Sequence, residues 1–440
     1  MLYAPSPVFD RLYERIAKMP VVDCHEHLQG PEARPPYKEP IAALIHGYVL
    51  SDLQSAAFGV PDRVFARLED PEVSTDEKWP LFERLWRATE HTAYARVTKL
   101  LLQRVYGESE LTRDALDRVA GKLAQQDEET YFRTIDQAGI VVMLTDVLGW
   151  LPQGLGSFLD GRKTFPDKLR PLISLPGLHP TTFNYELIAN AGRWADQNVT
   201  SLDEFLEAIW VVFERCIERG AVGIKDQSAY SRVIAYDLVP KADAERLFNR
   251  VLGDPRNALG WPEGKPLSDY LFHAYMRMAR DLDLPVQLHT GHMAGIRNRV
   301  PKTNAAHLAS ALELHREVRF DLFHGNWPYM GDLLFLGKNY PNVALDLCWL
   351  HIIDPDYASE LMERAVLTLP HTKLHAFGGD YGYVPEYVAC HLQIARENLA
   401  GTLARLVERG WLEEEEALSL AADWLYNNPN AFFGLNLPRS

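Results

Sequence analysis

The chain is poor in cysteine. Only four of its 440 residues are cysteines, and Cys24, Cys216, Cys348 and Cys390 lie far apart in the sequence. Few, scattered cysteines are typical of reduced thiols in a cytosol, whereas a small secreted domain would carry a disulfide framework. We therefore expect a cytoplasmic protein without disulfides.

Long apolar runs and an excess of positive charge are also missing. No stretch approaches the roughly eighteen consecutive apolar residues that a membrane-spanning helix needs. The net charge of −15, from 45 Lys and Arg against 60 Asp and Glu, lacks the basic excess typical of nucleic-acid-binding proteins. Residues 1–20 show an amphipathic pattern (Phe9, Leu12, Ile16) instead of the apolar centre of a signal peptide. We expect a soluble protein with neither a membrane nor a nucleic-acid partner.

The stretch Val21–Leu28 (VVDCHEHL) contains two histidines separated by one residue at the end of an apolar segment. Side chains two positions apart on a strand point to the same face, so His25 and His27 would project together. Two neighbouring imidazoles at the end of a strand can chelate one divalent metal. The stretch thus predicts two ligands of a metal site.

Seven further apolar segments have the length and composition of buried strands. They are Ile140–Leu144, Arg170–Leu175, Ala221–Lys225, Pro285–His289, Val318–His324, Val343–Cys348 and Leu374–Asp380. Helical periodicity separates most of them or follows the last, over Leu202–Arg219, Ser268–Asp283, Ala305–His315, Pro385–Val407 and Glu413–Tyr426. Ser268 is the expected N-cap of its helix, and the last helix is expected to stop ahead of Pro429. Eight strands alternating with helices predict an α/β fold of the (β/α)8 TIM-type barrel class.

A long segment at about residues 30–138 interrupts this alternation after the first strand. Its first part is rich in proline, and its later part keeps helical spacing, as in Trp79, Phe82, Leu85 and Trp86. No internal repeat or low-complexity segment is present. We therefore expect one barrel domain over residues 1–440 with a helical insertion that lies over the barrel mouth. Two alternatives remain for Arg87, His91, Tyr94 and Arg96 of the insertion: an ordinary charged helix face, or side chains that point inward to the barrel mouth.

Polar residues close several of the predicted strands. They are His25 and His27 on the first strand, Lys225 on the fourth, His289 on the fifth, His324 on the sixth and Asp380 on the eighth. Catalytic groups of TIM barrels come from the carboxyl ends of the strands. Imidazoles and a carboxylate from different strands can converge on one borderline metal such as Zn²⁺.

Five short motifs extend this pattern. They are Asp23–His27 (DCHEH), Gln287–Gly291 (QLHTG), Phe323–Asn326 (FHGN), Phe377–Tyr381 (FGGDY) and Asn428–Phe433 (NPNAFF). With these motifs the chain resembles the metal-dependent amidohydrolase superfamily, particularly its amidohydrolase 2 branch, from residue 21 to the C-terminus apart from the insertion. The resemblance implies that His25, His27, His289 and Asp380 bind a first metal. His324 would then be a substrate contact or a ligand of a second metal.

Lys225 has two possible roles. In binuclear members of the superfamily a lysine on the fourth strand is carboxylated and bridges two metals, which would add a second ion here. An unmodified amine would instead offer a cation to an anionic substrate, beside a single metal, most simply zinc. Tyr230 and Arg232 follow Lys225 and favour a substrate-recognition loop.

The expected chemistry is hydrolysis of an amide, ester or lactone bond of a small molecule. A bound metal lowers the pKa of water toward about 7, and Asp380 would accept the proton and return it to the leaving group. Related branches of the superfamily suggest two alternatives, a non-oxidative decarboxylase and an aldose–ketose isomerase. The chain resembles the uronate isomerases in its helical insertion after the first strand, and Trp349 is compatible with that activity. A catalytically inactive barrel used as a binding module is a further alternative.

The predicted mouth loops are cationic although the chain is acidic. Lys225 ends the fourth predicted strand and Arg232 follows it. Arg297, Arg299 and Lys302 follow the fifth strand. Local cations set the potential in a cleft more than net charge does, and a guanidinium binds a carboxylate through two hydrogen bonds. We therefore expect a carboxylate-bearing small-molecule substrate, bound with the help of Tyr230, Arg232, Arg297 and Trp349. A homo-oligomer is also expected.

Overall fold

Parallel strands form the centre of the protein. The computed structural model describes residues 6–33, 39–125, 127–149, 154–175, 178, 182–382 and 384–440. The central strands are β1 (Val21–Glu26), β2 (Ile140–Thr145), β3 (Leu169–Pro171), β4 (Ile173–Ser174), β6 (Ile224–Asp226), β8 (Val286–Leu288), β9 (Phe320–Leu322), β10 (Val343–Asp346) and β11 (Leu374–His375). They pair in the orders β1-β2-β3 and β11-β10-β9-β8-β6-β4, every pair being parallel.

Backbone hydrogen bonds join these two sheets into one ring. The N–H of Leu172, between β3 and β4, donates to Thr145 of β2 at 2.9 Å. On the other side, the N–H of Cys24 donates to the carbonyl of Phe377 at 3.0 Å, and that of Asp380 donates to His25 at 2.9 Å. Because β3 and β4 share one strand position, the ring has the eight positions of a TIM-type barrel. The predicted fold class is confirmed.

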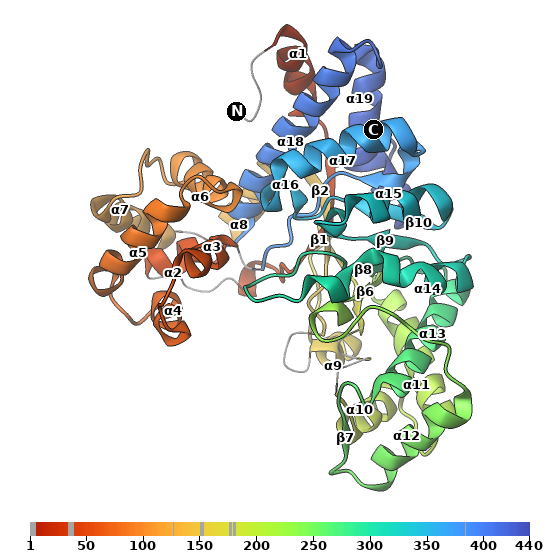
Figure 1. The fold of residues 1–440 in the computed structure, drawn as a ribbon. Coiled ribbons are helices and arrows are strands. Elements are labelled where there is room, and N and C mark those ends of the chain that lie inside the picture. Colours follow the sequence, from red (N-terminus) through yellow and green to blue (C-terminus); the bar gives the residue numbers. More distant parts are fainter. Residues whose placement is uncertain are drawn as a thin grey trace.

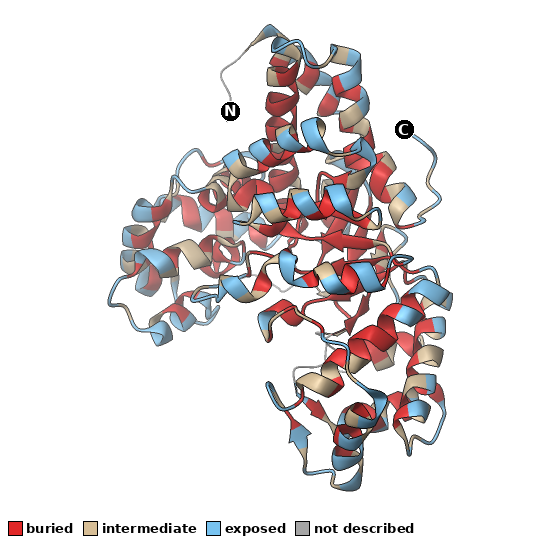
Figure 2. Ribbon diagram, turned by 45° about the vertical axis from the view of Figure 1, so that its right-hand side comes forward, coloured by how far each residue is buried: buried red, intermediate tan, exposed pale blue. Residues whose placement is uncertain are grey.

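Helices cover the outside of the barrel. They include α10 (Tyr185–Ala195), α11 (Leu202–Glu218), α12 (Lys241–Gly253), α13 (Lys265–Asp281), η5 (Ala305–Leu308), α14 (Ala309–Leu314), α15 (Met330–Asn339), α16 (Leu350–Ile353), α17 (Pro355–Thr368) and α18 (Pro385–Glu408). Their barrel-facing sides are buried and their outer sides exposed (Figure 2). In Figure 1, α10 to α12 extend downward as a lobe with the short antiparallel pair β5 (Phe183–Asn184) and β7 (Ala258–Leu259).

One predicted helix start is wrong. Helix α13 begins at Lys265 with Gly264 as its N-cap, three residues before Ser268. Pro266 lies in the first turn, where its missing N–H costs no helical hydrogen bond. The Ser268 hydroxyl instead accepts a hydrogen bond of 2.6 Å from the Arg232 guanidinium.

The segment between β1 and β2 is helical, as its periodicity indicates. It contains η1 (Pro31–Ala33), α2 (Pro40–Ile45), α3 (Val49–Ala56), α4 (Asp62–Glu69), α5 (Thr75–Thr89), α6 (Ala93–Arg104), α7 (Arg113–Leu123) and α8 (Glu128–Gln137). Helices α2 to α7 form the orange lobe to the left of the barrel in Figure 1, and α8 packs against α18. Buried Glu39 caps α2 and pairs with buried Lys78 of α5, which ties the lobe together.

Both ends of the described chain pack on the barrel. Helix α1 (Pro7–Ile16) buries Phe9, Leu12 and Ile16 against α18 and α19 (Glu414–Ala422). The helix predicted to stop ahead of Pro429 continues instead, through η8 (Asp423–Asn427) into α20 (Asn428–Phe432), because Pro429 occupies a first-turn position. Phe433 then packs with Cys24 inside the barrel. No helix within the described ranges is long and apolar enough to cross a membrane.

Candidate metal centre

Three of the predicted ligands lie together at the carboxyl end of the barrel. The Nε2 atoms of His25 and His27 lie 3.6 and 3.2 Å from Oδ1 of Asp380. One ligand atom from each of these residues lies within 4.8 Å of the others. His25 is fully buried, whereas the side chain of His27 is 31% exposed, so the cluster is open to solvent on the His27 side.

Hydrogen bonds fix the tautomer of both histidines. Nδ1 of His25 lies 3.1 Å from Oε1 of Gln287, whose amide nitrogen donates to the carbonyl of Cys24 at 2.8 Å. Nδ1 of His27 lies 2.7 Å from the carbonyl oxygen of Asp146. Because both oxygens can only accept, each Nδ1 carries the proton and each Nε2 keeps its lone pair.

This arrangement fits a divalent metal. Nε2 of His25 is buried and makes no hydrogen bond to any residue that the structure describes. Two imidazole nitrogens and one carboxylate are a common donor set for a catalytic zinc, which uses three protein ligands and keeps one position open. Each histidine also has the supporting acceptor on its other nitrogen that metal-binding imidazoles usually have.

The backbone around Asp380 is held on both sides. Asp380 has a left-handed φ of 65°, and its N–H donates to His25. Oε2 of Glu26 accepts the N–H of Tyr381 at 2.7 Å, and Oδ1 of Asp23 accepts that of Gly379 at 3.2 Å. A Cβ at position 379 would lie 1.9 Å from Oε1 of Glu26, so only glycine fits there.

The charge state of Asp380 suits a proton acceptor. Burial acts to raise the pKa of this carboxyl, but when His27 is protonated on Nε2 as well as on Nδ1, its hydrogen bond and charge, together with His324 and Lys225, outweigh that effect. The net effect holds the pKa of Asp380 below its usual value, so the group is ionised at neutral pH.

Lys225 lies inside the barrel next to the cluster. Its side chain is buried, and Nζ lies 3.2 Å from the centre of the Phe323 ring. Nζ has no hydrogen-bond acceptor among the residues described. Burial lowers the pKa of this ammonium, although Asp380 and other acidic groups oppose the effect. A ring face attracts a cation, which favours an unmodified ammonium over a carboxylated lysine.

His324 and His289 form a second pair beside the cluster. Nδ1 of His324 lies 2.9 Å from the carbonyl of Cys348, and its Nε2 lies 3.3 Å from Nδ1 of His289. One ligand atom each from His324, Cys348 and Asp380 lie within 4.8 Å of one another. Nε2 of His289 lies 2.8 Å from the carbonyl of His292. The structure therefore does not place His289 in the group formed by His25, His27 and Asp380.

Three of the cations predicted at the mouth have partners within the protein. Arg232 is 3% exposed, and its guanidinium forms an ion pair with Asp269 of α13 because a buried charge needs a partner. Arg297 is on the surface and forms an ion pair with Asp62 at 2.8 Å. Nζ of Lys302 donates to the carbonyl of Tyr230 at 2.8 Å.

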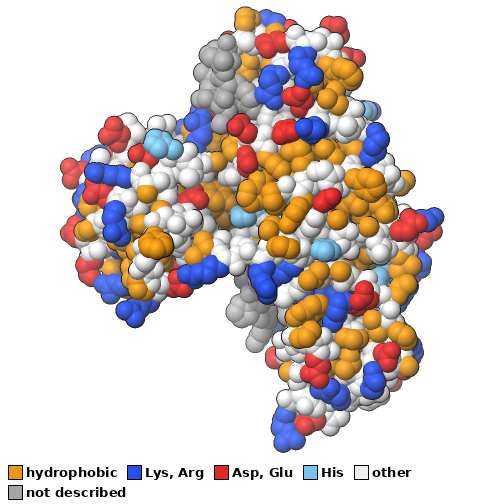
Figure 3. Space-filling view, in the orientation of Figure 1, with side chains coloured by type: hydrophobic (Ala, Val, Ile, Leu, Met, Phe, Trp, Pro, Cys, Tyr) orange, Lys and Arg blue, Asp and Glu red, His pale blue; other side chains and the backbone are white. Residues whose placement is uncertain are grey.

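The insertion supplies no free cation from its two candidate arginines. Arg87 pairs with Glu83 at 2.6 Å on the lobe surface, and Arg96 pairs with Glu397 of α18 at 3.4 Å. Figure 3 likewise shows positive and negative side chains interspersed over the face in view, with no broad cationic area.

Several aromatic side chains lie together next to His324. The ring of Trp349 lies 4.2 Å from that of Tyr48, 4.9 Å from that of His292 and 5.3 Å from that of His324, between centres. The ring of Tyr94, from α6 of the insertion, stacks on Trp349 at 6.0 Å. We call Tyr48, Tyr94, His292 and Trp349 the aromatic wall.

Sequence reasoning found only part of this wall. Trp349 was expected near the site and Tyr94 was a candidate, but Tyr48 and His292 lie in irregular segments that carry no periodic signal. Tyr230 does approach the site, since its ring lies 4.8 Å from that of His289. His179, a further histidine that follows the predicted strand Arg170–Leu175 in the sequence, lies outside the described residues.

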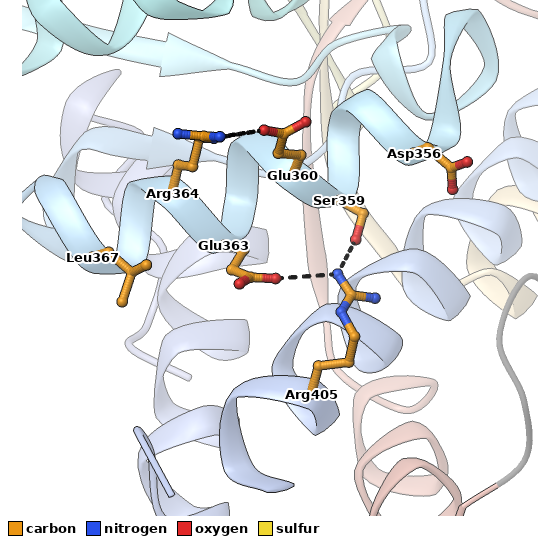
Figure 4. A pocket seen from close by; sticks show the side chains of 7 residues that line it. All are labelled: Asp356, Ser359, Glu360, Glu363, Arg364, Leu367 and Arg405. Carbon is orange, nitrogen blue, oxygen red and sulfur yellow. Dashed lines mark hydrogen bonds and ion pairs between the residues drawn. The ribbon is translucent and has the colours of Figure 1, made fainter. Parts of the chain in front are cut away.

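A cavity of about 210 Å³ adjoins Asp380 and is lined by Tyr48, Tyr381 and Tyr387 among others. A larger hollow of about 450 Å³ lies between α17 and α18 and contains none of the cluster residues. Its charged groups pair with one another, as Figure 4 shows for Arg405 with Ser359 and Glu363 and for Arg364 with Glu360. The cavity beside Asp380 is therefore the better candidate for a substrate.

The protein is a TIM barrel with a candidate metal-binding cluster at the carboxyl ends of its strands. The sequence comparison identifies its family. The model of the family described as Amidohydrolase matches residues 183–435. The chain belongs to this family. The matched segment includes His289, His324 and Asp380, while His25 and His27 precede it.

Two curated relatives match different lengths of the chain. Protein fluG of Emericella nidulans is 28% identical over 258 residues, which are 54% of this chain but only 30% of that protein. The uronate isomerase of Phenylobacterium zucineum is 23% identical over 474 aligned positions, covering 97% of this chain and 94% of the isomerase.

Solved structures share the fold over nearly the whole chain. The uronate isomerase of Thermotoga maritima has a TM-score of 0.76 at 15% identity and covers 98% of both chains. The glucuronate isomerase of Caulobacter crescentus has a TM-score of 0.74 at 18% identity, with 100% of this chain and 98% of that one covered. A putative metal-dependent hydrolase of Lactobacillus casei has a TM-score of 0.66 at 17% identity, with 96% and 97% covered.

Proposed function

We propose that the protein is a metal-dependent hydrolase that cleaves an amide, ester or lactone bond of a small molecule. The observation that carries this proposal is the convergence of His25, His27 and Asp380, with both Nε2 lone pairs directed by hydrogen bonds on Nδ1. When bound, a divalent metal such as Zn²⁺ lowers the pKa of water toward neutrality and polarises a carbonyl. The three residues would hold one such ion.

Asp380 is the proton carrier in this proposal. Its carboxylate accepts the proton of the attacking water as the new bond from water oxygen to the acyl carbon forms. It then returns that proton to the leaving nitrogen or oxygen as the scissile bond breaks, so no proton is gained or lost overall. The ionised state of the carboxyl at neutral pH and its position beside His27 support the acceptor role.

Lys225 and His324 are placed to act on the substrate. The buried Nζ of Lys225 lacks an acceptor among the residues described and can donate to an anionic oxygen of the substrate, such as a carboxylate or the developing oxyanion. Nδ1–H of His324 donates to the Cys348 carbonyl, which orients the ring toward the cluster. A substrate carboxylate would then meet Lys225 rather than a pair of arginines.

The aromatic wall supports a substrate with a flat, weakly polar ring face. Tyr48, Tyr94 and Trp349 present ring surfaces, and aromatic faces pack well on apolar rings and on the C–H faces of sugars.

An aldose–ketose isomerase acting on uronates is the second candidate. The specific observation in its favour is the similarity to uronate and glucuronate isomerases over nearly the full chain, the segment between β1 and β2 included. Because Arg232 and Arg297 are paired with Asp269 and Asp62, the carboxylate of a uronate would also have to meet Lys225, as in the hydrolase proposal.

One experiment separates the two reactions. N-acyl amino acids, lactones, uronic acids and aromatic carboxylates are each incubated with the metal-loaded protein in ¹⁸O-water, and the products are analysed by mass spectrometry. Hydrolysis adds one water and one ¹⁸O to the acyl product, as we expect. A product with the same elemental composition as its uronate substrate would instead establish the isomerase. If none of the compounds is converted, the result would favour the alternative of a catalytically inactive binding module.

A further inference from the structure

A second group of potential ligands lies deeper in the barrel. Cys24 of β1, Asp346 of β10 and His375 of β11 each offer one ligand atom within 4.8 Å of the other two. All three side chains are fully buried. The proposed hydrolytic reaction uses none of them.

Strand register explains why these residues meet. Asp346 pairs with His375 across β10 and β11, so both side chains point to the same face of the ring. The N–H of Cys24 donates to Phe377, two residues after His375, which brings β1 alongside. The cluster therefore spans the place where the first and last strands of the barrel meet.

His375 is oriented as a metal-binding imidazole would be. Its Nδ1 lies 3.0 Å from Oδ1 of Asp321, which accepts the Nδ1–H and leaves the lone pair on Nε2. That Nε2 is fully buried and has no hydrogen-bond partner within the described part of the chain. A carboxylate behind a histidine is the usual support of a metal ligand.

Asp346 and Cys24 also keep an available donor atom. Oδ1 of Asp346 accepts the N–H of Cys348 at 2.6 Å, whereas Oδ2 accepts no N–H or O–H from the described residues. The carboxyl group of Asp346 lies against that of Asp321 and the thiol of Cys24. Sγ of Cys24 lies 3.9 Å from the carbonyl of Val22 and also interacts with the carboxyl group of Asp346, so the two donor groups face each other. Buried polar atoms without partners are rare and usually mark a bound water or ion.

We propose that Cys24, Asp346 and His375 form a second divalent-metal site, with Asp321 orienting His375. One sulfur, one nitrogen and one oxygen donor suit a borderline ion such as Zn²⁺. The ion neutralises the thiolate and the neighbouring carboxylates, and it links β1, β10 and β11 where the ring closes. Because the site is fully buried, the metal is acquired during folding.

Cobalt spectroscopy tests the site separately from the proposed catalytic centre. The His25→Ala/His27→Ala variant is produced in cells supplied with cobalt, so that the first centre is lost. We expect about one remaining equivalent of cobalt per chain, as one site requires, with a near-ultraviolet sulfur-to-cobalt charge-transfer band. Adding Cys24→Ser should abolish the band, whereas adding Cys216→Ser, a buried cysteine of α11, should leave it unchanged.

The proposal would be overturned if the His25→Ala/His27→Ala variant held no cobalt. It would also be overturned if the variant held cobalt but showed no sulfur-to-cobalt charge-transfer band. Anomalous diffraction from cobalt-grown wild-type crystals needs no variant and gives a second test. We expect one peak enclosed by Cys24, Asp346 and His375, and the absence of signal there would refute this site. A missing peak at His25, His27 and Asp380 would refute only the proposed catalytic centre.

Discussion

Gln287 of β8 determines which nitrogen of His25 faces the metal centre. The Gln287 amide donates to the carbonyl of Cys24 at 2.8 Å, which turns its oxygen toward Nδ1 of His25 at 3.1 Å. The imidazole proton is thereby held on Nδ1, away from Asp380. A buried, uncharged side chain on one strand thus prepares a ligand on another.

Replacing Gln287 should therefore weaken metal binding without removing a ligand. Gln287→Leu keeps the volume but loses the acceptor, so His25 can place its proton on either nitrogen. We expect about a 10- to 100-fold loss of metal affinity, the usual cost of losing such a support. Competition with a chelator measures the affinity, and Gln393→Leu on α18 is the matched control. Equal affinities of the Gln287 variant and wild type would show that the tautomer is set by other contacts.

The substitution Asp380→Asn should impair proton transfer while the protein still folds. The amide keeps the shape of the side chain but cannot accept the proton of water. We expect kcat to fall by at least about 100-fold, the scale for a lost general base. Steady-state kinetics on the substrate identified by the ¹⁸O screen measures this, with Asp332→Asn on α15 as the control. Turnover close to wild type would remove Asp380 from the reaction.

Trp349 should act on substrate affinity more than on the chemical step. Trp349→Phe keeps a ring against Tyr48 but reduces the ring surface and removes the indole N–H. We expect KM to rise about 2- to 10-fold, corresponding to about 0.5–1.5 kcal/mol for an aromatic contact, with little change in kcat. Trp411→Phe, at an exposed position, should change neither parameter. A fall in kcat at constant KM would contradict contact with the bound substrate.

His351 should make stability depend on pH. This buried ring bonds to Ala376 and Asn398, and burial lowers its pKa from 6.5 to about 4. Between these values the unfolded chain binds the proton and the folded protein does not, so the free energy of unfolding falls as the pH drops. The loss is complete below the folded pKa and is on the order of 3 kcal/mol.

Denaturant unfolding of wild type and His351→Gln checks this effect. The two proteins should lose stability by different amounts between neutral pH and the folded pKa of His351, the variant losing less. His91→Gln replaces an exposed histidine and should follow the wild-type curve. If the wild-type and His351→Gln curves stay parallel, protonation of His351 does not contribute.

The barrel could be predicted because buried strands and amphipathic helices have clear periods. The histidines and Asp380 could be placed near one another because the carboxyl ends of parallel strands meet at one face of the barrel. Element boundaries were harder to predict. Helix α13 starts at Lys265 and not at Ser268, because the Ser268 hydroxyl accepts a hydrogen bond from Arg232 and does not cap the helix. A hydroxyl's partner in the folded protein is not visible in the sequence.

The substrate side of the site was the part that sequence could not predict. Arg232 follows the fourth strand as a binding residue would, but Asp269, 37 positions later, pairs with it. The positions of Tyr48 and His292 depend on irregular loops whose path is set by tertiary packing. The charges in the sequence predict an anion pocket, but they do not show that Arg232 and Arg297 are paired in the folded protein while Lys225 lies next to the cluster.

Metal content tests the central claim most directly. Wild type, His25→Ala/His27→Ala and the control His307→Ala are purified without chelator and analysed for transition metals. The account predicts that the double variant holds about one equivalent per chain less than the other two proteins, as expected for a single lost site. If the double variant holds as much metal as wild type, His25 and His27 do not bind the ion and the account is contradicted.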